Sequence, residues 1–166
     1  MATLVVSNPE IYKSNTPMEV DDDHFILNGQ SWKAGQWLTA DANSYLVACS
    51  SDADASSTPK GIKYQALEDV TDPGNNTTTA NVGVITQDMV FQANELDGTV
   101  AATDVGMHAA IDVTSNVVTI DIGDTGNDAV EVVGRMCDND PRYATTDVKA
   151  KILVKVLPAC LEAEAA

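Results

Sequence analysis

His24 and His108 are the only histidines in the chain, and they limit the catalysis that the sequence can support. A catalytic triad needs a Ser or Cys beside a positioned His and an acid, and no Gly-x-Ser-x-Gly turn occurs here. His24 follows three aspartates, and His108 lies between the apolar Met107 and Ala109. We expect both histidines to be structural or exposed, and we predict no catalytic residue and no enzymatic activity.

Aspartates gather in two places where a cation could bind. Asp21 to Asp23 are consecutive, and Asp121, Asp124 and Asp128 fall in one stretch rich in turn residues. Ca²⁺ accepts carboxylate and carbonyl oxygens flexibly, but the Asp-x-Asp-x-Asp-Gly pattern of a calcium loop is missing. We interpret these stretches as solvated turns of an acidic chain and predict no metal site. The chain also lacks a metal-binding His pair, a dinucleotide fingerprint and a phosphate-binding loop, so we predict no cofactor.

A carboxylate pair for glycoside hydrolysis stays open as an alternative, because the members of such a pair can be far apart in the chain. Sugar clefts are normally lined with aromatic side chains, however, and this chain has two Trp, four Tyr and two Phe. A small hydrolase is therefore a minor alternative.

Acidic residues outnumber basic ones by 25 to 9, which gives a formal net charge of −16 at pH 7. Binding to a phosphate backbone depends on Lys and Arg, so direct contact with nucleic acid is disfavoured, and so is an anionic membrane surface. Strong negative charge instead favours solubility and mutual repulsion. The cysteines Cys49, Cys137 and Cys160 show no Cys-x-x-Cys spacing, so we expect reduced thiols made in a cytosol. The chain starts without the pattern of a signal peptide, and no apolar run has membrane-spanning length.

The apolar pattern predicts many short strands. Val, Ala, Ile and Leu supply most of the apolar residues, while Gly, Thr, Asp and Asn are abundant between them. The expected strand centres recur about every 10 residues, which fits a small barrel or sandwich. We predict one all-β domain, a small β-barrel or β-tulip-like assembly, over residues 24–157. Residues 1–23 are expected as an extended N-terminal arm, and residues 158–166 as a short acidic C-terminal tail.

Two β-hairpins are predicted from local sequence. Asn28-Gly29, between His24–Leu27 and Ser31–Trp32, is the pair that a two-residue type I′ turn prefers. Met107–Val113 and Asn116–Ile122 are expected to form the second hairpin around Thr114-Ser115. Its inward side chains are expected to be Ile111, Val113, Val118 and Ile120.

Two apolar runs follow the second hairpin. Ala129–Met136 is apolar on both faces at Val132-Val133, which predicts a central strand. Lys149–Leu157 is the last expected strand, and Pro158 ends it. The tail beyond Pro158 has helix-forming residues but is too short to hold a helix without packing.

The order of these parts resembles a known family. The stretches that carry the resemblance are Lys33-Ala-Gly-Gln-Trp-Leu38, Tyr45-Leu-Val-Ala-Cys49, Gly61–Leu67 with Glu68-Asp-Val70, Val82-Gly-Val-Ile85, Asp104-Val-Gly106, Ala109–Asp112, Val117–Ile120, Val133-Gly-Arg135 and Ile152–Val156. From Ala34 to Leu157 this series is similar to the head decoration (cement) proteins of tailed bacteriophages. The resemblance depends on the order of the motifs, since none of them is a signature by itself.

The resemblance implies a non-enzymatic virion protein that binds the outer capsid surface and bridges subunits of the major capsid protein. It also implies a homotrimer on the capsid and contact through the arm. Within the arm we expect these residues to add a strand to the capsid: Leu4, Val5, Val6, Ile11 and Tyr12. For a subunit interface we consider Trp32 and Trp37, with core packing as the open alternative.

Another class of function stays open beside the capsid. A β-sandwich module that binds carbohydrate or a host surface would need an exposed aromatic platform, for which Trp32, Trp37 and Tyr45 are the candidates. Sugar binding that is lost on Trp37→Ala would favour this module.

Overall fold

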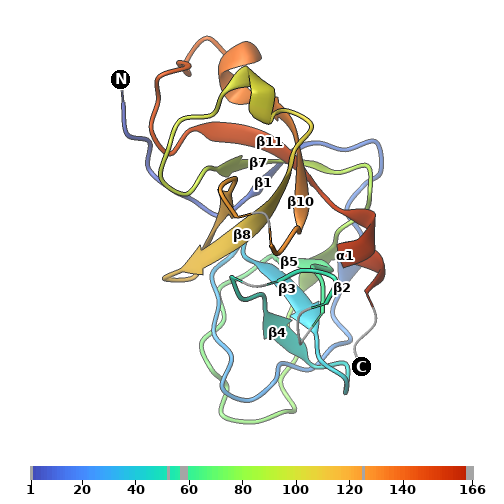
Figure 1. The fold of residues 1–166 in the computed structure, drawn as a ribbon. Helices are drawn as coiled ribbons and strands as arrows, with labels where there is room; N and C mark the ends of the chain where they lie inside the picture. Colours follow the sequence, from blue (N-terminus) through green and yellow to red (C-terminus); the bar gives the residue numbers. More distant parts are fainter. Residues whose placement is uncertain (1, 52, 57–59, 125, 164–166) are drawn as a thin grey trace.

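The computed structural model describes residues 2–51, 53–56, 60–124 and 126–163 of the chain. These residues form two antiparallel sheets with very little helix (Figure 1). In Figure 1 the six-stranded sheet occupies the upper part of the molecule, and the strands of the five-stranded sheet lie below it. The all-β prediction is therefore confirmed.

The six-stranded sheet has the order β1-β7-β11-β10-β8-β9. Its strands are β1 Glu10–Lys13, β7 Val90–Asn94, β8 His108–Thr114, β9 Val117–Asp121, β10 Val130–Arg135 and β11 Lys151–Val156. β10 lies between β11 and β8, so the strand expected to be central is internal. A bridge between Glu95 and Ile120 brings β9 back towards the end of β7, but the sheet does not close into a barrel.

The five-stranded sheet has the order β2-β6-β5-β3-β4 and is built from shorter strands. These are β2 Val20–Asp21, β3 Trp37–Ala40, β4 Leu46–Ala48, β5 Tyr64–Ala66 and β6 Val82–Val84. Isolated bridges extend the pairing outside the strands, at Phe25–Thr79, Ile26–Leu46 and Trp32–Val70. Residues of the long loop 67–81, such as Val70 and Thr79, take part in this pairing.

Two hydrophobic clusters form the core. The larger one extends from the six-stranded sheet to β3 of the other sheet and includes Trp37 and Phe91. The two rings meet edge to face with their centroids 5.3 Å apart, a contact that joins β3 of one sheet to β7 of the other. The smaller cluster lies within the five-stranded sheet and includes Ile26, Trp32 and Leu38.

The C-terminal residues 158–162 form the short helix α1 (Pro158–Glu162). Pro158 occupies the start of the helix, where its missing N–H would have no helical partner. Cys160 is fully buried, and its carbonyl accepts the Ile62 N–H at 3.2 Å. Packing against the loop before β5 therefore holds this short helix, as its length requires. Two 3₁₀ turns, η1 Ala102–Asp104 and η2 Met136–Asp138, complete the fold.

The second predicted hairpin is present as β8 and β9. Ile111 pairs with Ile120 and Val113 with Val118, and all four side chains lie in or against the core. The turn lies one residue later than predicted, at Ser115-Asn116, and both of these residues have positive φ. Positive φ at both central positions is the requirement of a type I′ turn.

The hairpin predicted around Asn28-Gly29 is wrong. A turn is present, but of its two central residues only Gly29 has positive φ, at +91°, so the turn is not of type I′. The segments on either side separate: Ile26 bridges β4, and Trp32 bridges Val70. Each segment thus finds its strand partner elsewhere in the five-stranded half.

Candidate functional site

The N-terminal residues lie against the sheets of their own chain. β1 forms the outer strand of the six-stranded sheet by pairing with β7, and β2 forms the outer strand of the five-stranded sheet by pairing with β6. A further bridge joins Thr3 to Val148. The segment expected as an extended arm therefore crosses both halves of the molecule and supplies an edge strand to each.

Asn8 fastens this segment between the two sheets. Its side-chain amide donates to the carbonyls of Ala34 at 3.3 Å and Asn116 at 3.0 Å, and its carbonyl accepts the Val118 N–H at 2.8 Å. Gly35 leaves room for this contact, because a Cβ there would stand 2.9 Å from the Cβ of Asn8. The Asn8-Pro9 pair, which in sequence indicates a break between elements, is thus the main attachment point.

Further hydrogen bonds on either side of Asn8 strengthen the attachment. The Ser7 N–H donates to the Asn94 side chain at 3.1 Å, and the Lys151 ammonium donates to the Ser7 hydroxyl at 3.0 Å. Burial lowers the pKa of this Lys151 ammonium. The Gln65 side-chain amide donates to the Pro9 carbonyl at 2.6 Å. Polar groups of Ser7, Asn8 and Pro9 therefore face the body of the protein.

Apolar side chains of the same segment face solvent. Val5 is 87% exposed, Val20 58%, Tyr12 44% and Ile11 38%, while Leu4 and Val6 are partly buried. These four exposed side chains are half of the large hydrophobic side chains that the described residues expose. All four lie in one stretch of sequence, residues 5–20, with Ile11 and Tyr12 on the edge strand of one sheet and Val20 on that of the other. Three of the five predicted arm residues, Val5, Ile11 and Tyr12, belong to this set.

A shallow groove runs beside β1. It is lined by Pro9, Glu10, Ile11, Met18, Ala34, Gly35, Gln65, Ala66 and Leu67. Met18 packs directly on Gly83 of β6, where any side chain would collide with the thioether. Sequence patterns do not single out Met18 or Leu67, because each borders the groove only through pairing between distant segments.

Trp32 and Trp37, considered for a subunit interface, are core residues. Both side chains are buried, at 1% and 0% exposure, in the two hydrophobic clusters. Neither indole N–H has a hydrogen-bond partner among the described residues. Neither ring can reach a neighbouring subunit from these positions. Core packing, the alternative left open for both tryptophans, is therefore confirmed.

The two histidines have partners that restrain them. The His24 ring lies 3.2 Å from the Tyr64 hydroxyl and 3.2 Å from the Asp21 carboxylate, and its other nitrogen lies 3.1 Å from the Ser44 carbonyl. Burial, together with the charge of Asp21, raises the pKa of the Tyr64 hydroxyl. The His108 Nδ1 lies 3.8 Å from the Asp128 carboxylate, and both side chains are exposed. Among the described residues, the hydrogen-bond and ion-pair partners of the His24 ring therefore include no Ser or Cys side chain.

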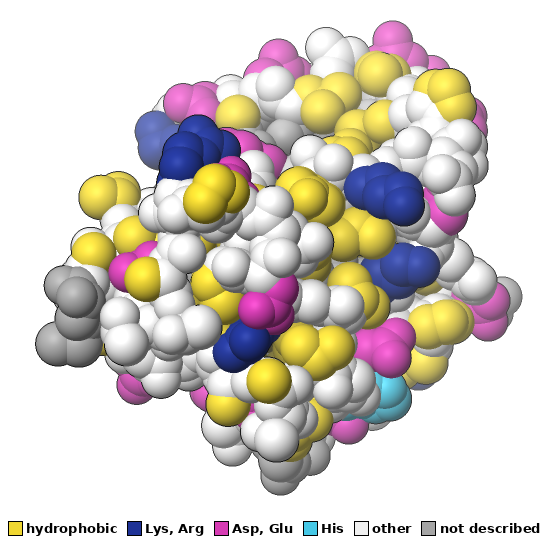
Figure 2. All heavy atoms as spheres, turned by 90° about the horizontal axis from the view of Figure 1, so that it is seen from above, with side chains coloured by type: hydrophobic (Ala, Val, Ile, Leu, Met, Phe, Trp, Pro, Cys, Tyr) yellow, Lys and Arg dark blue, Asp and Glu magenta, His cyan; other side chains and the backbone are white. Residues whose placement is uncertain are grey.

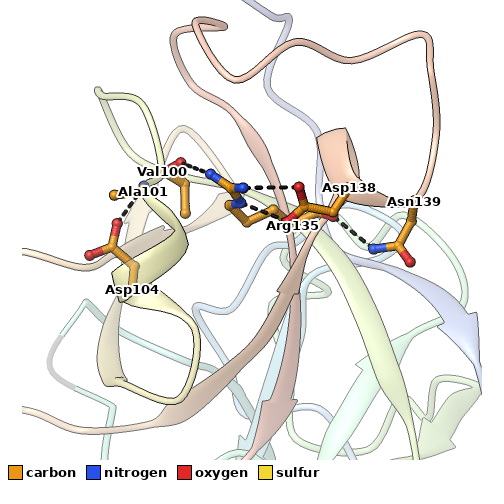
Figure 3. A network of polar contacts seen from close by, with 6 residues as sticks. All are labelled: Val100, Ala101, Asp104, Arg135, Asp138 and Asn139. Atoms are coloured by element: carbon orange, nitrogen blue, oxygen red, sulfur yellow. Dashed lines mark hydrogen bonds and ion pairs between the residues drawn. The ribbon is translucent and has the colours of Figure 1, made fainter.

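An arginine-centred network connects the end of β10 to the loop before η1. Figure 3 shows the Arg135 guanidinium donating to both oxygens of Asp138, at 2.8 and 2.9 Å, and to the Val100 carbonyl at 3.2 Å. The Asn139 side chain donates to the Arg135 carbonyl. Hydrogen bonding between the two charged groups raises the pKa of Arg135 and lowers the pKa of Asp138. The network is a structural tie in which both charges are already paired.

The Asp-rich turns use their carboxylates for local hydrogen bonds. Asp121 accepts the backbone N–H groups of Gly123 and Asp124, and Asp124 accepts that of Gly126. Among the described residues, no group of three or more His, Cys, Asp or Glu is arranged to hold a metal ion. Within the same residues, no helix has the length and apolar character needed to cross a membrane.

Charge on the surface is mixed. On the face drawn in Figure 2, hydrophobic, acidic and basic side chains are interspersed. Several basic side chains are held by carboxylates, such as Lys33 by Asp69 at 3.5 Å and Arg142 by Asp140 at 2.7 Å. The formal net charge of the whole chain is −16 at pH 7.

Comparison of the chain with family models, with curated proteins and with solved structures finds no match. The likeness to decoration proteins therefore depends on the order of the sequence motifs. The N-terminal segment remains the candidate site: Ser7, Asn8 and Pro9 are hydrogen-bonded to the body, while Val5, Ile11, Tyr12 and Val20 are exposed.

Proposed function

We propose that this protein is a non-enzymatic structural protein that binds the outer surface of a phage capsid and stabilises it by bridging subunits of the major capsid protein. The observation that supports this proposal is that the N-terminal segment is fixed to the body by hydrogen bonds and still exposes apolar side chains. Hydrogen bonds of Ser7, Asn8 and Pro9 fix the segment to the body, while Val5, Ile11 and Tyr12 stay exposed. A segment fixed in this way loses little conformational entropy when a partner covers its apolar side.

The energy available from each contact is modest. Burying apolar surface contributes about 25 cal/mol per Å² removed from water, so a few side chains bind weakly by themselves. Many copies arranged on a symmetric shell act together, and a homotrimer would multiply the contacts that must break at once. In this proposal the two sheets form the tulip-like body of a decoration protein, and the N-terminal segment forms its capsid-facing contact.

The composition agrees with a place on the outside of the virion. A net charge of −16 disfavours direct contact with packaged nucleic acid and keeps copies apart in the host cytoplasm until they meet a capsid. Free cysteines fit synthesis in that reducing compartment. The carbohydrate-binding alternative gains no support from the aromatic side chains, because both tryptophans of the expected platform are buried.

The test is co-sedimentation of the purified protein with phage heads that lack their decoration protein. Deleting residues 1–23 would remove an edge strand from each sheet, so surface substitutions are the sharper probe. We expect the Val5→Asp/Tyr12→Asp variant to bind at least about tenfold more weakly than the wild type. The matched control, Val105→Asp/Met107→Asp, alters two exposed apolar side chains outside the segment, at 41% and 40% exposure, and should bind normally.

Two outcomes would overturn the proposal. One is that the wild-type protein binds none of a panel of such heads. The other is that both double variants bind as the wild type does, which would separate binding from the N-terminal segment. Circular dichroism of each variant checks that the substitutions leave the fold unchanged.

A further inference from the structure

A pocket of about 290 Å³ lies on the outward face of the β8–β9 hairpin. Asp112 of β8 and Thr119 of β9 pair across the two strands, and both line this pocket. Their sequence neighbours Ile111 and Ile120 belong to the larger hydrophobic cluster. Because successive side chains of a strand point to opposite faces, Asp112 and Thr119 project from the face that the core does not use.

Apolar side chains from three separate parts of the chain form the walls of the pocket. Val6 comes from the N-terminal segment, Leu96 follows β7, and Val117 belongs to β9. All three are partly buried. The volume is close to the lower limit of ordinary ligand pockets. At about 30 Å³ for each water-sized group, it suits a ligand of about ten non-hydrogen atoms with an aliphatic part.

Two polar groups of the pocket have no partner within the part of the chain that the structure describes. The Lys149 backbone carbonyl accepts the Asn94 amide at 2.8 Å, but its ammonium forms neither a hydrogen bond nor an ion pair there. The Thr119 side chain is only 5% exposed, and its hydroxyl has no hydrogen-bond partner. A buried hydroxyl without a partner is unfavourable, so a bound acceptor would stabilise it. A carboxylate can accept from both groups.

Asp112 adds the opposite charge to the same pocket. Its two carboxylate oxygens accept the Ser51 hydroxyl at 3.3 Å and the Thr114 hydroxyl at 2.8 Å. Each oxygen has two lone pairs, so the carboxylate can still accept from an ammonium group. Among the described residues, Asp112 and Lys149 line one pocket without forming an ion pair with each other. A ligand that carries both charges therefore matches the pocket better than a simple anion, which Asp112 would repel.

We propose that this pocket binds a free α-amino acid with a branched aliphatic side chain, of about the size of leucine. Its carboxylate accepts from the Lys149 ammonium and the Thr119 hydroxyl, and its ammonium donates to Asp112. Its side chain packs against the apolar walls, which are Val6, Leu96 and Val117. This inference goes beyond the proposed function and does not depend on it.

The test compares leucine with two analogues that each lack one charge. Isocaproate has the leucine skeleton without the ammonium, and isopentylamine has it without the carboxylate. In two-dimensional NMR of the full-length protein, we expect leucine to shift the amides of residues 112–119 and of Lys149. Each analogue should bind at least about tenfold more weakly, because each loses one of the two charge contacts.

Two variants locate the carboxylate of the ligand. Lys149→Gln should weaken leucine binding by at least about tenfold and leave isopentylamine binding unchanged. Thr119→Val removes a hydroxyl that has no partner among the described residues, so it should weaken leucine binding without loss of stability. Lys155→Gln is the matched control, because Lys155 lies in β11 and does not line the pocket. It should bind leucine as the wild type does.

Three outcomes would overturn the inference. The first is that leucine at about 10 mM shifts no amide of the pocket, which would mean that the pocket holds only water. The second is equal binding of leucine and both analogues, which would indicate an apolar cavity without charge recognition. The third is wild-type affinity for leucine in Lys149→Gln. A dispersed spectrum of each variant confirms its fold.

Discussion

The turns at Asn28-Gly29 and Ser115-Asn116 are both two residues long, yet only the second closes a hairpin. Asn-Gly is the dipeptide that hairpin turns prefer, and here the segments that flank it pair with different parts of the chain. Ser-Asn is not the preferred pair, and it connects β8 to β9 with both residues at positive φ. Turn preference alone therefore did not determine which strands pair.

The difference lies in where the flanking side chains are buried. In β8 and β9, the paired residues Ile111 and Ile120 face the same core, so pairing and burial favour one arrangement. Around Asn28-Gly29, Ile26 and Trp32 are both buried in the smaller cluster but reach it beside different segments. Burial of large side chains outweighs a turn preference, which contributes on the order of 1 kcal/mol.

The largest effect is expected from removing one of these buried side chains. Trp32→Ala should lower the free energy of unfolding by about 3 to 5 kcal/mol, because the indole is fully buried and a cavity would remain. The control, Phe25→Ala, removes a half-exposed ring from the same segment and should cost far less. Denaturant unfolding measures both. Equal losses would show that burial of Trp32 does not determine the path of this segment.

Strands β8, β9, β10 and β11 of the six-stranded half could be predicted from sequence, whereas β1 lies in the segment expected as an arm. The four predicted strands are long enough to show alternation, as at Ile111 and Val113, or a continuous apolar run, as at Val132-Val133. Neighbours in the chain are also neighbours in space for β8 and β9. The five-stranded half has strands of two to four residues; β3, β4, β5 and β6 fall in short apolar runs of the sequence, but the runs do not indicate which strands pair. Its pairing depends on distant loops.

The candidate site likewise contains some residues that could be predicted from sequence and others that could not. Val5, Ile11 and Tyr12 could be found as apolar residues in a segment otherwise rich in polar residues and proline. Asn8 could not, because its three hydrogen bonds reach residues 26 and about 110 positions away. The partial exposure of Leu67 likewise follows from tertiary contacts and leaves no local pattern.

The second prediction concerns the backbone at Gly29. Gly29→Ala should destabilise the protein by about 1 to 2 kcal/mol, since φ of +91° strains any residue with a Cβ. No atom lies within 4 Å of the added Cβ, so the loss would come from the backbone alone. Gly123→Ala is the control, as Gly123 lies outside the positive-φ region. An unchanged thermal midpoint for Gly29→Ala would mean that the backbone of this turn can change its conformation without loss of stability.

The third prediction concerns the Ser115-Asn116 turn, which closes the hairpin of β8 and β9. Asn116→Gly should stabilise the protein by about 0.5 to 1 kcal/mol, because φ of +62° costs a glycine nothing. The carbonyl that accepts from Asn8 belongs to the backbone and is kept. Asn43→Gly, at a turn residue without positive φ, should instead be slightly destabilising. A loss of stability in Asn116→Gly would show that its side chain makes a contribution larger than the strain.

The smallest expected effect is a pH dependence of local stability around the Asn28-Gly29 turn. The Asp72 carboxylate accepts the N–H groups of Gly29 and Gly74, and the Asp69 carboxylate accepts that of Ala34. These hydrogen bonds lower the pKa of both carboxyls in the folded protein. A lowered pKa means that the stabilisation is complete above the unfolded value, about 3.9, and is lost as the pH falls through the folded values.

Hydrogen exchange at a series of pH values below about 5 measures this loss. Protection of the amides at Gly29 and Ala34 should fall before protection in β8 and β9, where pairing depends on buried side chains. Both carboxylates are solvent-exposed, so the effect is small and weakens with salt. Asp72→Asn keeps an acceptor but cannot titrate, and in this variant the pH dependence at Gly29 should disappear. If β8 and β9 lost protection first, the hairpin that the sequence predicted correctly would be the less stable of the two regions. Side-chain burial would then not explain why it forms.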